Sequence, residues 1–533
     1  MPRPLRRSLL ALTAAALLAA LPPAGAVAQS HPEPAFRVEE ATVADVRSAM
    51  ADGDLSCYQL IHGYLRRIAA YDIGGPALNS LITVSDDALR QARSLDAAYA
   101  RRGPVGPLHC IPVILKDNVD TADMPTTAGS KTLAGSVPAE DATITARLRE
   151  AGAVILAKAN MDEWAHGGAG GYSAVGGRTY NPYDLGSPSG SSGGTGASIA
   201  ASFGILGIGT DTQGSIRGPV STNGLAGVKT TRGLVSGAGI VPFALTFDVA
   251  GPMTRTVTDS AEMLNVIAGY DPADPRTEAS IGRVPDDYTA TLTRDALEGA
   301  RIGLLEPYAS DDLDEAVAVF ESLGAEVVPV TAPQEIRTLS STYYQIISET
   351  EFVTQLAEYL QTSRPDAPVK THADVLAAAE QPDSGVAPEV LVRLRREATR
   401  GTMQDPAYLQ AVSYAPAAMR AGLDALLEEH DLDALLHDGS SALASFSGYP
   451  EVLVPAGLDD DGDPFSLQLL GPAFSEPTLL GFAYAFEQAT LARPLPPYTP
   501  PLSALPPSAG RPPREPIIDC PTRSPRAAAA LGC

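Results

Sequence analysis

Short apolar runs of strand length alternate with helical patterns along most of the chain, and this alternation restricts the fold more than any other feature. The runs that predict strands cover residues 110–115, 153–157, 205–208, 301–305, 326–330, 451–455 and 465–470. Helical patterns fall between them at 142–151, 196–203 and 315–323. Such alternation predicts an α/β fold with a mostly parallel or mixed sheet.

Helical patterns also precede and interrupt this series. Thr42 and Ser56 are suitable N-cap residues, and apolar residues recur at helical spacing after Ser56. A further helix is predicted over residues 86–100. The long stretch 335–430 is mostly helical in pattern, and we expect it to cover the sheet or the site.

The N-terminus has the pattern of an export signal. Three arginines precede an apolar run from Leu9 to Leu21, and Ala26-Val27-Ala28 matches the small-x-small cleavage pattern before Gln29. This predicts a signal peptide over 1–28 and a secreted or periplasmic protein. An uncleaved anchor is the alternative, although the run is shorter than the ~20 residues of a spanning helix. The pair Arg6-Arg7 is also compatible with twin-arginine export.

The remaining segments are assigned by composition. Residues 29–37 are predicted to be a flexible N-terminal segment, and the Pro-rich residues 497–533 a flexible tail. After signal cleavage no apolar run is long enough to span a membrane. Acidic residues number 63 and basic residues 38, a net charge of −25 that argues against nucleic acid or an anionic membrane as a partner. The oligomeric state is not predicted.

The four cysteines do not form a disulfide scaffold in a chain of this length. An oxidising compartment would allow one or two bridges among three possible connectivities. Cys520 and Cys533 are close enough in sequence to pair. Cys110 lies in an apolar run, and we expect it to be a buried free thiol. The fourth cysteine is Cys57. None has the spacing of a metal site.

The Gly/Ser-rich stretch from Gly186 to Gly233 contains most of the candidate catalytic residues. It lies between apolar segments, which favours close backbone approach to a ligand over a flexible linker. A serine nucleophile needs a base and donors for the oxyanion. The seven histidines have no obvious partner, but Lys116 ends an apolar strand, where burial would lower its pKa. The alternative for Lys116 is an ion pair with Asp117 or another carboxylate.

Several ordered motifs around these residues resemble those of the amidase signature family. They cover residues 106–118, 124–130, 147–161, 181–185, 188–196, 209–219, 224–230, 448–450 and 454–457. The resemblance spans about residues 38–495 and is strongest over 104–260. It implies a single large domain over 38–496, with a central mixed twisted sheet covered by helices on both faces.

The resemblance also implies roles for individual residues. Ser215 corresponds to the nucleophile that becomes an acyl-enzyme ester, and Lys116 to the base. Ser191 corresponds to the bridging serine, which in the family follows a cis peptide bond, here Gly190–Ser191. The backbone N–H groups of Thr212, Gln213, Gly214 and Ser215 correspond to the oxyanion hole. Ser192, Asp211 and Arg217 are expected to support the loops. No metal or organic cofactor is implied.

The chain departs from the family pattern at three positions. The family often has Gly where Ser189 and Gln213 stand, and a bulkier residue where Gly218 precedes Pro219. These departures concern substrate preference more than catalysis. The chain looks closest to the bacterial peptide-amidase branch, which removes the C-terminal amide of peptides, so we expect a small-molecule or short-peptide amide substrate. A broad aliphatic or aryl amidase is the alternative.

Two other interpretations stay open at this point. Gly190 to Gly194 also satisfies the G-x-S-x-G pattern of α/β-hydrolase esterases, with Ser192 as nucleophile and His430 or His437 as its histidine. A catalytically silent binding protein could also use the same scaffold.

Overall fold

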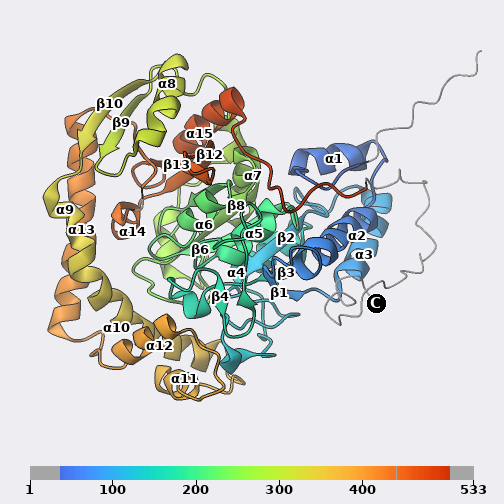
Figure 1. Ribbon diagram of the computed structural model, residues 1–533, viewed down its shortest axis with the longest axis horizontal. Helices are drawn as coiled ribbons and strands as arrows, with labels where there is room; N and C mark the ends of the chain where they lie inside the picture. The colour runs from blue at the N-terminus through green and yellow to red at the C-terminus, as the bar shows by residue number, and fades with distance from the viewer. Residues whose placement is uncertain (1–35, 440, 504–533) are drawn as a thin grey trace, which may run out of the picture.

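The computed structural model describes residues 36–439 and 441–503. Among these residues, eleven strands form one mixed sheet (Figure 1). In their order across the sheet they are β1 (Leu81–Val84), β3 (Val154–Ala159), β2 (Pro112–Lys116), β6 (Leu206–Asp211), β8 (Val249–Thr254), β7 (Ala226–Lys229), β12 (Glu451–Leu458), β13 (Pro464–Leu470), β11 (Ala434–His437), β9 (Arg301–Glu306) and β10 (Glu326–Thr331). The predicted α/β class with a mixed sheet is confirmed.

Helices flank this sheet along its length (Figure 1). They are α1 (Val43–Ala51), α2 (Cys57–Arg67), α3 (Ala88–Arg102), α4 (Thr143–Glu150), α5 (Gly193–Ala200), α6 (Arg217–Thr222), α7 (Val257–Ile267), α8 (Asp314–Ser322), α9 (Gln334–Arg337), α10 (Leu339–Thr362), α11 (His372–Ala379), α12 (Pro388–Glu397), α13 (Pro406–Glu429), α14 (Leu443–Ser447) and α15 (Glu476–Thr490). The predicted caps are present, because Thr42 accepts from the N–H of Asp45 and Ser56 from that of Gln59.

Three adjacent strands create the geometry that the site uses. β2 lies between β3 and β6 and runs parallel to both. The carboxyl ends of the three strands therefore meet at one edge of the sheet, where α/β folds commonly place ligands. β2 begins at Pro112, two residues later than predicted, because Cys110 has a positive φ of 69° and cannot continue an extended strand.

The helices α9–α13 occupy the stretch 335–430 that was predicted to be mostly helical. Figure 1 shows them as an arc beside the sheet, on the side away from α1, α2 and α3. They build a second hydrophobic cluster, which includes Phe352, Leu356 and Met419. This cluster also contains Trp164, Phe243 and Phe446, which follow strands of the sheet or lie beside them. The helical region is thus joined to the sheet by shared apolar packing.

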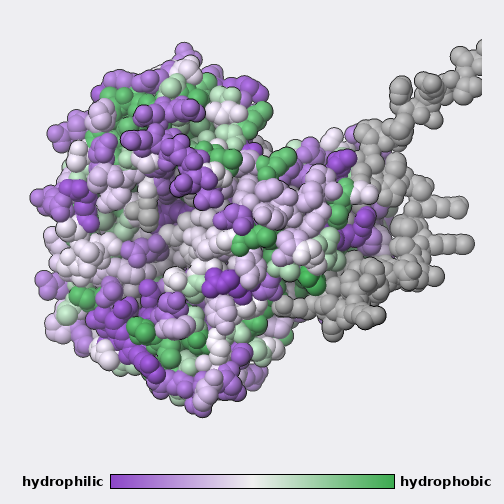
Figure 2. Space-filling model, viewed as in Figure 1, coloured by the Kyte–Doolittle hydropathy of each residue, from purple (hydrophilic) through white to green (hydrophobic). Residues whose placement is uncertain are grey.

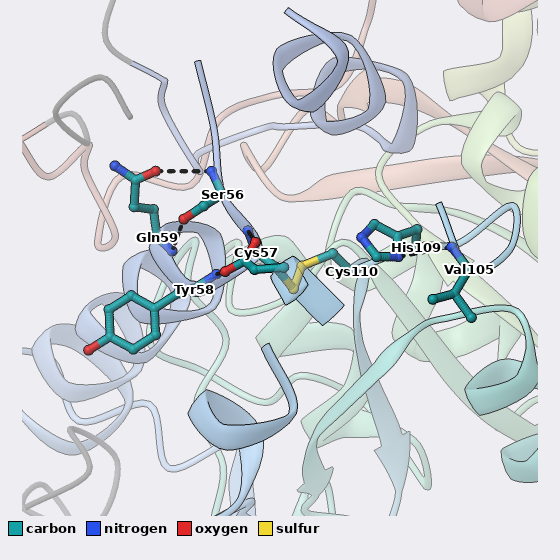
Figure 3. The surroundings of a disulfide bond; sticks show 8 residues. Ser56, Cys57, Tyr58, Gln59, Val105, His109 and Cys110 are labelled. Carbon is teal, nitrogen blue, oxygen red and sulfur yellow. Dashed lines mark hydrogen bonds between the residues drawn. A yellow bond between two sulfur atoms is a disulfide. The ribbon is translucent and has the colours of Figure 1, made fainter. Parts of the chain in front are cut away.

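The prediction that Cys110 is a free thiol is wrong. Cys57 begins α2 and Cys110 lies just before β2; their Cα atoms are 5.5 Å apart and the sulfurs form a disulfide (Figure 3). Their sequence separation of 53 residues concealed this proximity. Cys110 is buried, as expected, but its apolar surroundings contain the second sulfur as well.

The first residues of the predicted flexible tail are held in place. The buried guanidinium of Arg67 donates to the carbonyl oxygens of Thr499 and Pro500 at 2.7 and 3.1 Å, and Leu502 N donates to Glu39 at 2.6 Å. The ordered part of the chain therefore extends past residue 497. The predicted signal peptide, most of segment 29–37, Cys520, Cys533 and the tail beyond residue 503 lie outside the described residues.

The face of the molecule in Figure 2 is largely hydrophilic, with hydrophobic residues in small, separate patches. Within the described part of the chain, no helix combines the length and the apolar character needed to cross a bilayer.

Candidate active site

The side chain of Lys116, the last residue of β2, is fully buried. Its Nζ lies 2.7 Å from Oγ of Ser191, 2.8 Å from Oγ1 of Thr210 and 3.2 Å from the carbonyl oxygen of Thr210. Thr210 belongs to the neighbouring parallel strand β6. A neutral amine has two N–H donors and one lone pair. Both donors can be taken up by Thr210, which leaves the lone pair for the proton of Ser191.

Burial lowers the pKa of Lys116 from its ordinary 10.5 to about 7, although the carboxylates of Asp162, Asp211 and Asp248 act in the opposite direction. A large fraction of this amine is therefore neutral near pH 7. The alternative of an ion pair between Lys116 and Asp117 is wrong. Asp117 instead lies 3.6 Å from Nζ of Lys158.

Ser191 is held in a crowded backbone environment. It is fully buried, and the Gly190–Ser191 peptide bond is cis. Its carbonyl oxygen accepts from the N–H of Asp162 at 3.1 Å. A Cβ at residue 190 would lie 2.2 Å from Oδ2 of Asp162, and one at Gly194 would lie 2.3 Å from the carbonyl oxygen of Asn160. Gly190 lies against the carboxylate of Asp162 and Gly194 against the backbone of Asn160, so neither position has room for a side chain.

Ser215 lies in the turn between β6 and α6 and is half-buried. Its carbonyl oxygen accepts from the N–H of Ser192 at 3.3 Å, which fixes the turn beside the segment that carries Ser191. Among the described residues its hydroxyl has no hydrogen-bond partner. The structure therefore joins Lys116 to Ser191 directly and places Ser215 on the adjoining turn, without a hydrogen bond between the two serine hydroxyls.

The carboxylate of Asp211 organises this turn. It accepts from the N–H of Gly214 at 2.7 Å and from that of Ile216 at 2.9 Å. The N–H of Arg217 also donates to Asp211 at 3.4 Å, whereas those of Gln213 and Ser215 have no acceptor among the described residues. The φ of Gly214, 116°, is one that side chains rarely allow. The N–H of Gly214 is engaged with Asp211, and the role of Thr212, Gln213, Gly214 and Ser215 as oxyanion donors stays a prediction.

A buried ion network extends from Asp211. Arg217 contacts Asp211 through Nε at 3.3 Å and Glu451 through Nη1 at 2.8 Å. It also donates to the Ser441 carbonyl and to Oγ of Ser445, each at 2.8 Å. Burial alone would raise the pKa of Asp211, but Arg217 and the N–H donors outweigh it and hold that pKa below its ordinary value. The expected supporting role of Asp211 and Arg217 agrees with these contacts.

The residues nominated for an α/β-hydrolase lie elsewhere. Oγ of Ser192 is buried and exchanges hydrogen bonds with the backbone of Thr210 at 3.2 and 3.3 Å. His437 bonds Glu451 at 2.9 Å, and His430 is the C-cap of α13. Within the described residues no histidine forms a hydrogen bond with Ser192, and the esterase interpretation is wrong.

The departures from the family pattern have structural counterparts. A Cβ at Gly218 would lie 2.7 Å from Oγ of Ser189, so the serine at 189 occupies the space that the glycine leaves. The side chain of Gln213 donates to Oγ of Ser340 at 2.7 Å, which ties the turn to α10. The two changes at 189 and 218 are therefore matched to one another, while Gln213 connects the site to the helical region.

Several residues of the site were not predicted from the sequence. Thr210 bonds Lys116, Asp162 contacts the Ser191 segment, and Asp248 accepts from Oγ1 of Thr212 at 2.6 Å. Asp162 could have been found, since it follows β3 as Asp117 follows the parallel β2. Glu451 had no signal, because a glutamate inside an apolar strand run cannot be paired from sequence. Within the described chain, no group of His, Cys, Asp and Glu has metal-binding geometry.

Comparisons with known proteins agree with this geometry. The amidase family model matches residues 59–438. A probable amidase of Arabidopsis thaliana is 38% identical over 490 residues, covering 88% of this chain and 94% of the plant protein. A glutamyl-tRNA(Gln) amidotransferase subunit from Gloeobacter violaceus is 35% identical over 486 residues, covering 84% of this chain and 96% of the cyanobacterial one.

A similar solved structure is that of native peptide amidase from Stenotrophomonas maltophilia. It is 39% identical, with a TM-score of 0.81 and coverage of 86% of this chain and 99% of that one. Both the order of motifs and the fold are therefore shared over most of the chain. The chain belongs to the amidase family, in its amidase-signature form, and is an amidohydrolase acting on carbon–nitrogen bonds other than peptide bonds.

Proposed function

We propose that this chain is an exported amidase that hydrolyses the C-terminal carboxamide of peptides through an acyl-enzyme on Ser215. The observation that carries the proposal is the 2.7 Å contact between Nζ of Lys116 and Oγ of Ser191. An amine whose pKa is lowered to about 7 by burial, and which touches a hydroxyl, is equipped to act as a general base.

The relay moves one proton in each direction. Neutral Lys116 takes the proton of Ser191, Ser191 takes that of Ser215, and Oγ of Ser215 bonds to the amide carbon. The proton then returns through Ser191 to the leaving nitrogen as the C–N bond breaks and ammonia departs. Water hydrolyses the resulting ester by the same path and regenerates the hydroxyl of Ser215.

The oxyanion is assigned to backbone donors of the turn after β6. The N–H groups of Gln213 and Ser215, with Thr212 as a third donor, are proposed to hold the negative oxygen of the tetrahedral intermediate. Removing one such donor typically costs ~3 kcal/mol of transition-state stabilisation. Asp211, Arg217 and Ser192 keep the turn and the neighbouring strand in place.

The peptide carboxamide is the substrate class that the comparisons favour. Peptide amidase from Stenotrophomonas maltophilia is matched over 99% of its own length and 86% of this chain. In this chain, Gln213 and Ser340 form a polar contact between the turn and α10. A broad aliphatic or aryl amidase is the second candidate, because 189, 213 and 218 differ from the common family pattern.

Export is supported by two features far apart in sequence. One is the predicted signal peptide over residues 1–28. The other is the buried disulfide between Cys57 and Cys110, since such bonds persist mainly in oxidising compartments. Fractionation of cells expressing the full chain, with N-terminal sequencing of the product, tests this part. Recovery of the uncleaved chain in the cytoplasm alone would refute it.

Ammonia release from a panel of peptide amides, simple carboxamides and fatty amides tests the substrate class. We expect the highest kcat/KM on peptide amides and none in the Ser215→Ala variant. Activity on simple carboxamides without activity on peptide amides would favour the second candidate, a broad aliphatic or aryl amidase. Full activity of Ser215→Ala would refute the acyl-enzyme on Ser215.

A further inference from the structure

Glu451 is a buried carboxylate that the relay does not use. It begins β12, has no exposed surface, and lies on the opposite side of Arg217 from Asp211. One carboxylate oxygen accepts from Nη1 of Arg217 at 2.8 Å and the other from Nε2 of His437 at 2.9 Å. Glu451 thus joins the last β strands of the chain to the turn that carries Ser215.

His437 lies against the side of Glu451 that does not contact Arg217. Its Nδ1 lies 3.1 Å from the carbonyl oxygen of Gly439 and its Nε2 lies 2.9 Å from Glu451. Arg217 thus lies between two buried carboxylates, Asp211 and Glu451, and the imidazole of His437 lies beside the second.

All three nitrogens of the Arg217 guanidinium form hydrogen bonds within this cluster. Nε and Nη2 contact Asp211, Nη1 contacts Glu451 and the Ser441 carbonyl, and Nη2 also contacts Ser445. Asp211 in turn accepts from the N–H groups of Gly214, Ile216 and Arg217, so the position of Arg217 fixes which N–H groups are left to face the substrate. Glu451 is the anion that holds the far side of Arg217.

We propose that Glu451 is a positioning residue of the amidase reaction: through Arg217 and Asp211 it orients the N–H groups of Gln213 and Ser215 toward the oxyanion. The inference rests on the proposed function, because it requires that Ser215 attack the carbonyl. Its signature is a loss in the affinity for the tetrahedral state, with ground-state binding retained.

The test compares Glu451→Gln with Glu39→Gln, a control in a mostly buried pair remote from the turn, where Arg67 contacts Glu39 at 2.9 Å. A peptide aldehyde, which adds Ser215 reversibly to form a hemiacetal, reports on the oxyanion position, and the corresponding peptide alcohol reports on ground-state binding. We expect Glu451→Gln to lower kcat by about 10- to 100-fold and weaken the aldehyde equally, with KM and alcohol affinity changed less than about threefold. Glu39→Gln should change none of the four.

Three results would overturn the proposal: unchanged kcat in folded Glu451→Gln, equal weakening of aldehyde and alcohol, or the same kinetic loss in Glu39→Gln. If Glu451→Gln does not fold, Glu451→Asp gives the same comparison, because it keeps the charge but is too short to reach both Arg217 and His437. Catalytic activity in Ser215→Ala would refute the proposed function. An inactive Ser215→Ala together with an unchanged kcat in Glu451→Gln would refute only the positioning role.

Discussion

Lys116 on β2 and Lys158 on the adjacent parallel strand β3 are both fully buried, and burial lowers the pKa of both. Lys158 lies 3.6 Å from Asp117 and donates to Oγ1 of Thr126 at 2.7 Å. Lys116 contacts the hydroxyl oxygens of Ser191 and Thr210 and one carbonyl oxygen, with no carboxylate at ion-pair distance among the described residues. Only Lys158 has a carboxylate at ion-pair distance, and that carboxylate opposes the lowering of its pKa by burial.

The strand geometry explains which lysine receives the carboxylate. Leu115 is the pairing partner of Lys158, so these two side chains lie on one face of the sheet and Lys116 lies on the other. Asp117, one residue further, returns to the face of Lys158. Asp117, in the turn after β2, therefore contacts Lys158 and not Lys116, which was the alternative ion pair.

Replacing Lys116 should produce the largest effect. We expect Lys116→Ala to lower kcat/KM by about 10³- to 10⁴-fold at pH 7.5, because general-base catalysis contributes on this scale. The midpoint of thermal unfolding should fall moderately, because the buried side chain leaves a cavity but no unpaired counter-ion. Steady-state ammonia release and calorimetry measure the two effects. A near-normal rate would exclude the relay.

Lys158→Met should have the opposite effect to Lys116→Ala: a loss of stability with kcat largely retained. It leaves Asp117 buried without its cation, and we expect the free energy of unfolding to fall by about 3–5 kcal/mol. The folded enzyme should keep kcat within a few-fold. Adding Asp117→Asn should restore part of the stability, because the unpaired charge is then absent. A large loss of kcat in folded Lys158→Met would assign this lysine to catalysis as well.

The disulfide stabilises the segment that leads into β2 without touching the amine. Cys57→Ser with Cys110→Ser should lower the free energy of unfolding by about 2–4 kcal/mol, as expected for a cross-link over a loop of this length. The kinetic constants of the folded variant should match those of the parent. Chemical denaturation of both proteins provides the measurement. A change in the pH dependence of kcat/KM would contradict the separation between stability and base function.

The smallest expected effect is the pH dependence itself. The base must be neutral, and the pKa of Lys116 is lowered to about 7, so kcat/KM should rise about tenfold per pH unit below 7 and level off above it. Lys158→Met should show the same profile. A profile that is flat between pH 5.5 and 8 would show that neither lysine limits the reaction as a base.

The sequence by itself predicted the parts that depend on local pattern and on ordered motifs. The strand that ends in Lys116, the alternation of strands and helices, and the segments around Ser191 and Ser215 all follow from runs of residues close together in the chain. The caps at Thr42 and Ser56 were found for the same reason. Their physical basis, hydrogen bonding and side-chain periodicity within a few residues, is visible in a linear sequence.

Only the tertiary structure decided which groups meet. The bond between Cys57 and Cys110, the pairing of Asp117 with Lys158, the hold of Arg67 on residues 499 and 500, and the link from Glu451 to Asp211 through Arg217 join residues separated by up to several hundred positions. Ion pairs and disulfides depend on distance in space and on the face of the sheet from which a side chain projects. Both are fixed by strand order and register, which no single segment specifies.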